Sequence, residues 1–433
     1  MRRPFLALSL LLAVPAAAQI IPRDDDSFHP SHDLPAIDVK AAEEAQPWPL
    51  RLIMQELKNG MLVRLPVVDT DPNRGVTVGV MPIWVLKDPK GGERIRSIHA
   101  PSLTYNGIVG VTPTYRYYIY PTDKSDYEFR TSWSTVEEKE LVGELEDADF
   151  LGKGVLVHGK LQYNVDASGR FFGLGPDAPR AAEANFTRKT FQYDWRVGLP
   201  IFKESGFKFN FGHHLAGERI ADGPINSLPD VNTRFPGLVG SRFHQDGELQ
   251  LFVDFDSRDD GVTTTKGSYA KILVDNAQDA WGSEFPFQRY QLDLRHFDKR
   301  GADGRFVTAG RFLFEHLVGN VPFYLKPSLG GKQTHRAYGD GRYIDHALMT
   351  ASLEERVTIH KIPLAGVTTE FEVAPYFELG TVAGAPRRFA GRYARPVLGT
   401  AFRAIARPQV VGSIDVGVGR EGPNVFMDIN YSF

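Results

Sequence analysis

Apolar and polar residues alternate with a period of two along most of the chain from about Arg74 onward. The segment 187–199 shows this most clearly, with Phe191 and Trp195 on one parity and Gln192 on the other. Successive side chains of a β-strand point to opposite faces, so the alternation predicts strands with one apolar and one polar face. Three more segments predict strands of the same kind: 127–133, 155–164 and 249–256.

Glycine, proline, asparagine and aspartate interrupt the alternation roughly every 15 to 25 residues, as turns between strands do. Aromatic residues fall near the ends of the apolar faces, and these faces carry almost no charge. A lysine or arginine in the middle of a bilayer costs roughly 2–4 kcal/mol, so an uncharged face suits lipid. The expected fold is all-β, a transmembrane antiparallel β-barrel of about sixteen strands with long outer loops. The alternative is a soluble, exported sandwich, which would fold without detergent.

The N-terminal segment predicts export. Residues 1–18 combine a basic start, an apolar run and three alanines before Gln19, which is the layout of a secretory signal peptide. Residues 19–73 are polar and contain several prolines, so we expect a flexible periplasmic leader, with a short helix or hairpin over 50–65. The outer-membrane barrel is then expected over residues 74–433.

Composition excludes several classes of protein. The 433 residues include no cysteine, which rules out disulfides and thiolate metal sites. A net charge of -3 gives no strongly basic surface for nucleic acid. His213 and His214 are adjacent on a predicted strand, so their side chains point to opposite faces and do not chelate one metal ion together. No cofactor and no nucleic-acid partner are expected.

Motifs of common enzymes are missing from the sequence. It contains no Gly-x-Ser-x-Gly elbow, and Gly331 and Lys332 lack the upstream glycine of a phosphate-binding loop. Glu354 and Glu355 are neighbouring charges on a strand rather than a shaped pair of acids. We therefore expect a protein that is not an enzyme.

The last nine residues alternate from Val425 to Phe433, with Tyr431 and Phe433 on the apolar parity. This segment resembles the C-terminal signal by which outer-membrane proteins are recognised for insertion. The resemblance implies contact with the outer-membrane assembly machinery during biogenesis and a location in the outer membrane of a Gram-negative bacterium. A core strand that happens to end the chain is the plainer interpretation.

The segment from Ser328 to Tyr343 reads SLGGKQTHRAYGDGRY. It resembles the loop of the BamA/TamA superfamily, also called the bacterial surface antigen family, that folds back into the barrel lumen. His335 stands where that family has an aliphatic residue, and Ala337 stands where it has glycine, which adopts positive φ more readily. The candidate residues of this lumen loop are Arg336, Tyr338, Asp340 and Arg342.

The resemblance also assigns the loop arginine an acidic partner on a late strand. Glu378, within the segment 376–380, fits the family pattern, and Asp415 is a second candidate. A guanidinium can bind a carboxylate through paired hydrogen bonds, and a narrow lumen screens that pair less than open water does. A loop arginine exposed to solvent is the alternative.

Two other segments resemble the same superfamily. The segment 171–176 reads FFGLGP, which is similar to a turn of its barrel-only members. A strand-and-turn motif is matched further along, although Thr264 occupies the usual proline position. The residues that match it are Asp256, Arg258, Asp259 and Gly267.

The family resemblance implies a noncatalytic barrel that assists insertion or passage of polypeptides at the outer membrane. Its expected partners are outer-membrane lipid, the assembly machinery and a polypeptide client. The stretch before residue 74 is too short for a periplasmic substrate-binding domain, so the sequence resembles the short, barrel-only branch. A passive pore or a purely structural barrel is therefore the alternative function.

Overall fold

The computed structural model describes residues 54–433, except 88–94, 123, 203–204, 302–303, 365–366, 407–409 and 429–430. The predicted signal peptide, and the predicted leader up to residue 53, lie outside the described residues. The strands are β1 (Met54–Leu57), β2 (Gly60–Asp69), β3 (Thr77–Lys87), β4 (Ile95–His99), β5 (Ser102–Asn106), β6 (Gly110–Thr122), β7 (Ser125–Trp133), β8 (Lys139–Phe150), β9 (Val155–Phe171), β10 (Ala184–Pro200), β11 (Phe207–Asp222), β12 (His244–Asp256), β13 (Gly267–Ala277), β14 (Phe287–Arg300), β15 (Phe306–Gly319), β16 (Ser328–Leu329), β17 (Tyr343–Ile344), β18 (Ala347–Leu364), β19 (Val367–Ala383), β20 (Arg395–Ala406), β21 (Val410–Gly419) and β22 (Gly422–Asp428). Short helical turns lie in the connections: η1 (Arg180–Ala182), α3 (Val231–Arg234), η2 (Asp279–Trp281), η3 (Phe323–Leu325), η4 (Pro386–Arg388) and η5 (Gly391–Tyr393).

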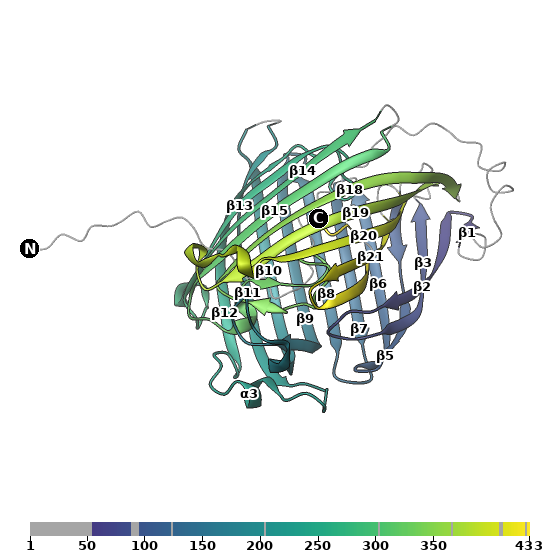
Figure 1. Ribbon diagram of the computed structural model, residues 1–433. Helices are drawn as coiled ribbons and strands as arrows, with labels where there is room; N and C mark the ends of the chain where they lie inside the picture. The colour runs from purple at the N-terminus through teal and green to yellow at the C-terminus, as the bar shows by residue number, and fades with distance from the viewer. Residues whose placement is uncertain are drawn as a thin grey trace, which may run out of the picture.

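All of these strands except β16 and β17 belong to one 20-stranded antiparallel sheet. β4 and β5 both lie between β3 and β6, so they are two pieces of one broken strand, and the described sheet has nineteen strand positions. This count is higher than the prediction of about sixteen. In Figure 1 the sheet curls round so that β18 to β21 pass in front of β6 to β9. The prediction of an all-β, antiparallel barrel is confirmed.

The two faces of the sheet have the polarity expected in a membrane. On β10, Phe191 is 55% exposed and Trp195 is 42% exposed, whereas Gln192 is 3% exposed. On β19, Phe377 is 41% exposed while Glu378, the next residue, is 2% exposed. Apolar side chains thus cover the outside and polar side chains fill the lumen, which is the reverse of a soluble sandwich. Among the described residues, no helix is both long enough and apolar enough to cross a membrane.

The sheet begins earlier than the sequence pattern suggested. β1 and β2 form a hairpin over Met54–Asp69, and β2 pairs with β3 along its whole length. The boundary predicted at Arg74 is therefore too late, although the expected hairpin near 50–65 is present. β2 was assigned to the leader and not to the barrel, because Pro66 stands within its alternating residues and proline is uncommon inside a strand.

The last strand is shorter than predicted. β22 ends at Asp428, whereas the alternating pattern predicted a strand to Phe433. Residues 431–433 are not part of a strand, and Phe433 is only 9% exposed. Phe433 packs with Phe297, Val307 and Ala309 from β14 and β15. Residues 431–433 therefore do not continue the predicted strand, because Phe433 packs inside the barrel.

The long connections gather at one end of the barrel, which we call the loop end. Strand pairing places 172–183, 223–243, 278–286, 320–346 and 384–394 there. The opposite end, the turn end, carries the connection 257–266 between β12 and β13. The connection 320–346 turns back from the loop end and packs against residues of the late strands, which positions the candidate site.

Candidate functional site

The lumen loop, residues 328–343, is built as a closed turn. β16 pairs with β17 at its base. Gly330 and Gly331 have φ values of +136° and +81°, and a Cβ on Gly330 would lie 2.0 Å from the carbonyl oxygen of Gly339. The Gly331 amide donates to the Tyr338 carbonyl at 2.8 Å, and the His335 amide donates to the Gly331 carbonyl at 3.1 Å. Two glycines therefore allow the tight crossing that presents Arg336 at the tip.

Arg336 is completely buried and is bound on several sides. Its backbone amide donates to Glu378 Oε2 at 2.7 Å, and its Nε donates to Glu378 Oε1 at 2.6 Å. Its Nη1 donates to Glu354 Oε2 at 3.0 Å and contacts Asp415 Oδ2 at 3.4 Å. The guanidinium also lies 3.5 Å from the ring centroid of Tyr376. The structure thus brings Arg336 together with both acidic residues proposed as its partners.

Glu354, on β18, joins this arginine to a wider network. Its carboxylate receives hydrogen bonds from Arg403 Nη1 at 2.6 Å and from Arg356 Nε at 2.8 Å. Arg403 also binds Glu372 on β19 at 2.9 Å. Three guanidinium groups therefore face four carboxylates, those of Glu354, Glu372, Glu378 and Asp415.

Burial makes this network sensitive to the loss of any member. Removing one partner of a buried ion pair leaves an uncompensated charge, which costs about 3–5 kcal/mol. The acids come from β18, β19 and β21, and Arg403 comes from β20. The loop tip is consequently tied to four consecutive strands of one wall.

The two departures from the family loop are accommodated locally. The only described residues other than glycine with positive φ are Glu137 and Leu151, so Ala337 adopts no conformation that requires glycine. His335 is buried, donates a 2.6 Å hydrogen bond from Nε2 to the Arg395 carbonyl, and stacks on Tyr338 at 5.3 Å between ring centroids. The imidazole therefore replaces an aliphatic side chain by stacking and by one polar contact.

Tyr338 and Arg342 attach the rest of the loop to the β21–β22 turn. The amide of Arg420 donates to the Tyr338 hydroxyl at 3.0 Å, and Arg342 Nε donates to Glu421 at 2.8 Å. A Cβ added to Gly419 would lie 2.9 Å from the Tyr338 ring, so this glycine leaves room for the ring. Both residues thus hold the loop against the last two strands.

Asp340 lies near the turn between β2 and β3. Asn73 Nδ2 donates to the Asp340 carbonyl at 2.8 Å. Asp340 is exposed to the lumen, but desolvation by the surrounding protein, followed by the nearby carboxylates of Asp71 and Asp166, raises its pKa to about 7. Its charged form is therefore disfavoured where it lies.

The segment 171–176 meets the lumen loop directly. The Gly175 amide donates to the Ile344 carbonyl at 2.9 Å, and Leu174 forms a parallel bridge with Ile344. Arg342 Nη1 donates to the Ala178 carbonyl at 3.0 Å. Two segments that the sequence singled out separately are thus parts of one packed unit.

The strand motif of β12 and β13 forms a compact turn at the other end. Arg258 binds Asp256 through two hydrogen bonds, at 3.0 and 2.8 Å. Asp259 accepts the amides of Thr265 and Lys266 at 2.8 and 3.1 Å. Gly267 has a φ of +105°, and a Cβ there would lie 2.3 Å from the Ser257 carbonyl oxygen.

This turn also reaches the buried network. The carbonyl of Thr264, at the usual proline position of the motif, receives a 3.4 Å hydrogen bond from Arg356 Nη1. The same arginine donates to the Phe433 carbonyl at 3.1 Å and lies 3.8 Å from the ring centroid of Tyr431. The strand motif and the C-terminal residues therefore converge on Arg356.

Sequence reasoning missed the other members of the network, Glu354, Arg356, Glu372 and Arg403. The sequence feature that could have located them is their position in the alternating pattern. Each occupies a lumen-facing position of its strand, next to outward-facing residues such as Leu353 and Phe402. Parity places a charge in the lumen, but it does not say which charges meet across strands. Glu355 points away from Glu354 and contacts Arg300, so the two neighbouring glutamates do not form an acid pair.

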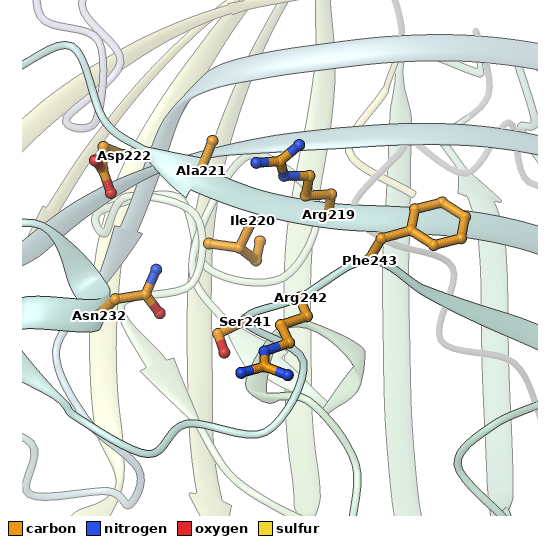
Figure 2. A pocket seen from close by; sticks show the side chains of 8 residues that line it. All are labelled: Arg219, Ile220, Ala221, Asp222, Asn232, Ser241, Arg242 and Phe243. Carbon is orange, nitrogen blue, oxygen red and sulfur yellow. The ribbon is translucent and has the colours of Figure 1, made fainter.

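A pocket of about 410 Å³ lies apart from this network, between the end of β11 and residues 241–243. Figure 2 shows Arg219 and Arg242 on either side of it, with Ile220 and Ser241 between them. The two guanidinium groups do not converge on one point, so we assign the pocket no ligand. Within the described part of the chain, no group of three or more histidines and acids could hold a metal ion.

An apolar outer face around a polar lumen that holds a buried loop is typical of an outer-membrane β-barrel. Residues 125–419 match the Omp85 superfamily domain, and the chain belongs to this superfamily. The resemblance to the BamA/TamA superfamily is thereby confirmed. The family and the barrel fold together imply an outer-membrane protein of a Gram-negative bacterium.

Two solved structures are similar to this chain at low sequence identity, and the first of them shows the same fold. The crystal structure of BamA from Haemophilus ducreyi lacking POTRA domains 1–3 is 15% identical, with a TM-score of 0.53 over 84% of this chain and 74% of that chain. CdiB from Acinetobacter baumannii is 14% identical, with a TM-score of 0.39 over 86% of this chain and 60% of that chain. No curated protein matches this chain.

Proposed function

We propose that the protein is a noncatalytic barrel that assists the insertion or passage of polypeptides at the outer membrane. The strands at its seam would separate to admit the client, while the lumen loop braces the late strands beside that seam. The observation that carries this proposal is the contrast between a weak seam and a strongly tied wall. Membership of the Omp85 superfamily supports it.

The seam lies between β2 and β22. Among the described residues, these two strands share no backbone ladder, whereas β21 and β22 pair over seven positions. The Thr70 hydroxyl donates to the Val425 carbonyl at 2.6 Å. Lys332, from the lumen loop, donates to the Met427 carbonyl and lies 4.0 Å from Asp69. Few contacts would have to break for the seam to open.

The late strands β18 to β21, which adjoin the seam through β22, would stay paired during such a motion. β18 and β19 pair over fifteen positions, and Arg336 links β18, β19 and β21 from inside. Buried ion pairs in a low-dielectric lumen hold their partners more strongly than exposed pairs do. Opening at the seam therefore costs less than opening elsewhere.

The proposed role can be tested with the full chain in liposomes. A urea-denatured small outer-membrane barrel would be added, and its folded fraction followed by its mobility on unheated gels. Liposomes containing an equal amount of a porin serve as the control. We expect faster folding of the client with this protein than with the porin. Equal rates, together with a large and steady conductance, would support the alternative of a passive pore and contradict the proposal.

A further inference from the structure

The edge of β2 that faces away from β3 is covered by this chain itself. β1 pairs with it over four positions, from Met54 opposite Val63 to Leu57 opposite Gly60. Beyond this stretch, toward the loop end, the Thr70 contact with Val425 joins the edge to β22. The two ends of the barrel seam are thus closed by different segments.

The C-terminal residues are held away from this edge. Ser432 donates to Asp415 Oδ2 at 3.2 Å, and Arg356 binds the Phe433 carbonyl at 3.1 Å. Phe433 also packs against Phe297 in the lumen. A segment anchored on the inner wall in this way does not extend β22 along β2, so the turn end of the β2 edge is left to β1.

β1 is attached to the edge of β2 by few contacts. The strand has four residues and is joined to β2 by the two residues Lys58 and Asn59. The turn is fixed by the amide of Lys87 on β3, which donates to the Asn59 carbonyl at 2.9 Å. Beyond the backbone pairing, Gln55 contacts Arg64. A four-residue strand at the edge of a sheet opens more readily than the long strands behind it.

We propose that β1 is a built-in substitute strand, which covers the edge of β2 until an extended segment of a client polypeptide replaces it. This proposal rests on the proposed function. An exposed strand edge binds another strand through main-chain hydrogen bonds, which depend little on sequence. The fitting partner is a segment with alternating apolar residues, because one of its faces must meet lipid.

The experiment locks β1 in place. Gln55 and Leu62 lie directly opposite each other, and opposed residues of antiparallel strands are close enough for a disulfide. The chain has no cysteine of its own, so a Gln55→Cys/Leu62→Cys variant forms one defined bond. The control is Thr114→Cys/Ser132→Cys on β6 and β7, where the two hydroxyls lie 3.0 Å apart and away from the seam.

Client insertion into liposomes is measured for each variant, oxidised and then reduced. We expect oxidation of the 55–62 pair to slow insertion by about tenfold, because the edge cannot be vacated, and reduction to restore it. The 114–132 pair should insert within about twofold of the unmodified chain in both states, because its bond joins strands that stay paired. Insertion by the oxidised 55–62 variant at the unmodified rate would overturn the proposal.

A second variant releases β1 from the edge of β2, whereas the disulfide locks it there. Gln55→Pro removes a main-chain donor and disfavours the strand, so β1 should leave the edge and insertion should become faster. An unchanged rate would contradict the inference about β1. An unmodified chain that does not insert the client at all would instead count against the proposed function, so the two failures are distinguishable.

Discussion

At the scale of single residues, the lumen is organised around the guanidinium of Arg336. Glu378 binds both its backbone amide and its Nε, and Glu354 extends the contact to Arg356 and Arg403. The pairing of Arg336 with Glu378 could be predicted from the family motifs. The role of Glu354 could not, because strand parity gives the face of a residue and not its partner across the sheet.

Replacing Arg336 by alanine should strongly destabilise the barrel. Three carboxylates would lose a buried cation, so we expect a loss of about 3–5 kcal/mol. The matched control is Arg300→Ala, because this side chain is 53% exposed and pairs with Glu355. The control should change stability by less than about 0.5 kcal/mol. The temperature at which each variant changes mobility on a gel measures both effects, and equal temperatures would contradict the buried network.

The raised pKa of Asp340 predicts that the stability of the lumen loop depends on pH. Its pKa in the folded protein is raised from 3.8 to about 7. The folded state therefore binds the proton more tightly than the unfolded chain, and this stabilisation is present below about pH 4 and is lost as pH rises through about 7. Asp340→Asn should lose this part of the pH dependence. Thermal unfolding of both proteins across this range checks it, and parallel profiles would argue against it.

At the scale of elements, the sequence motif at the turn between β12 and β13 forms a turn that contacts the buried network of the lumen. Asp259 binds the amides of Thr265 and Lys266, and this folds the turn inward until Thr264 reaches Arg356. The sequence motif located the turn correctly. It did not reveal the contact with the lumen, which depends on a strand nearly one hundred residues further along the chain.

Gly267→Ala should disrupt this turn. The glycine has a φ of +105°, and a Cβ would lie 2.3 Å from a backbone oxygen, so we expect a loss of about 1–3 kcal/mol. Gly143→Ala on β8 is the control, because nothing lies within 4 Å of its Cβ position. Comparing the unfolding temperatures in detergent tests the prediction. A control that loses as much as Gly267→Ala would show that the turn geometry is not the cause.

At the scale of the whole molecule, the period-two pattern was sufficient to predict an antiparallel barrel with an apolar outside. It failed at both ends of the sheet. At the start, Pro66 weakened the signal of β2, so β1 and β2 were assigned to the leader. At the end, the alternation continued to Phe433, but the contacts of Tyr431 with Arg356 and of Ser432 with Asp415 turn these residues inward. An alternating pattern within one segment carries no information about contacts with residues far away in the sequence.

The lumen loop is held inside the barrel by the binding of Arg336 to Glu378 and Glu354. Single-channel conductance in a planar bilayer tests this anchoring, with the unmodified chain and Arg336→Ala compared in the same membrane. We predict small, fluctuating conductance for the unmodified chain and a larger, more frequently open state for the variant, because the loop loses its anchor. A large and steady conductance that is identical in the two proteins would show that Arg336 does not hold the loop in the lumen.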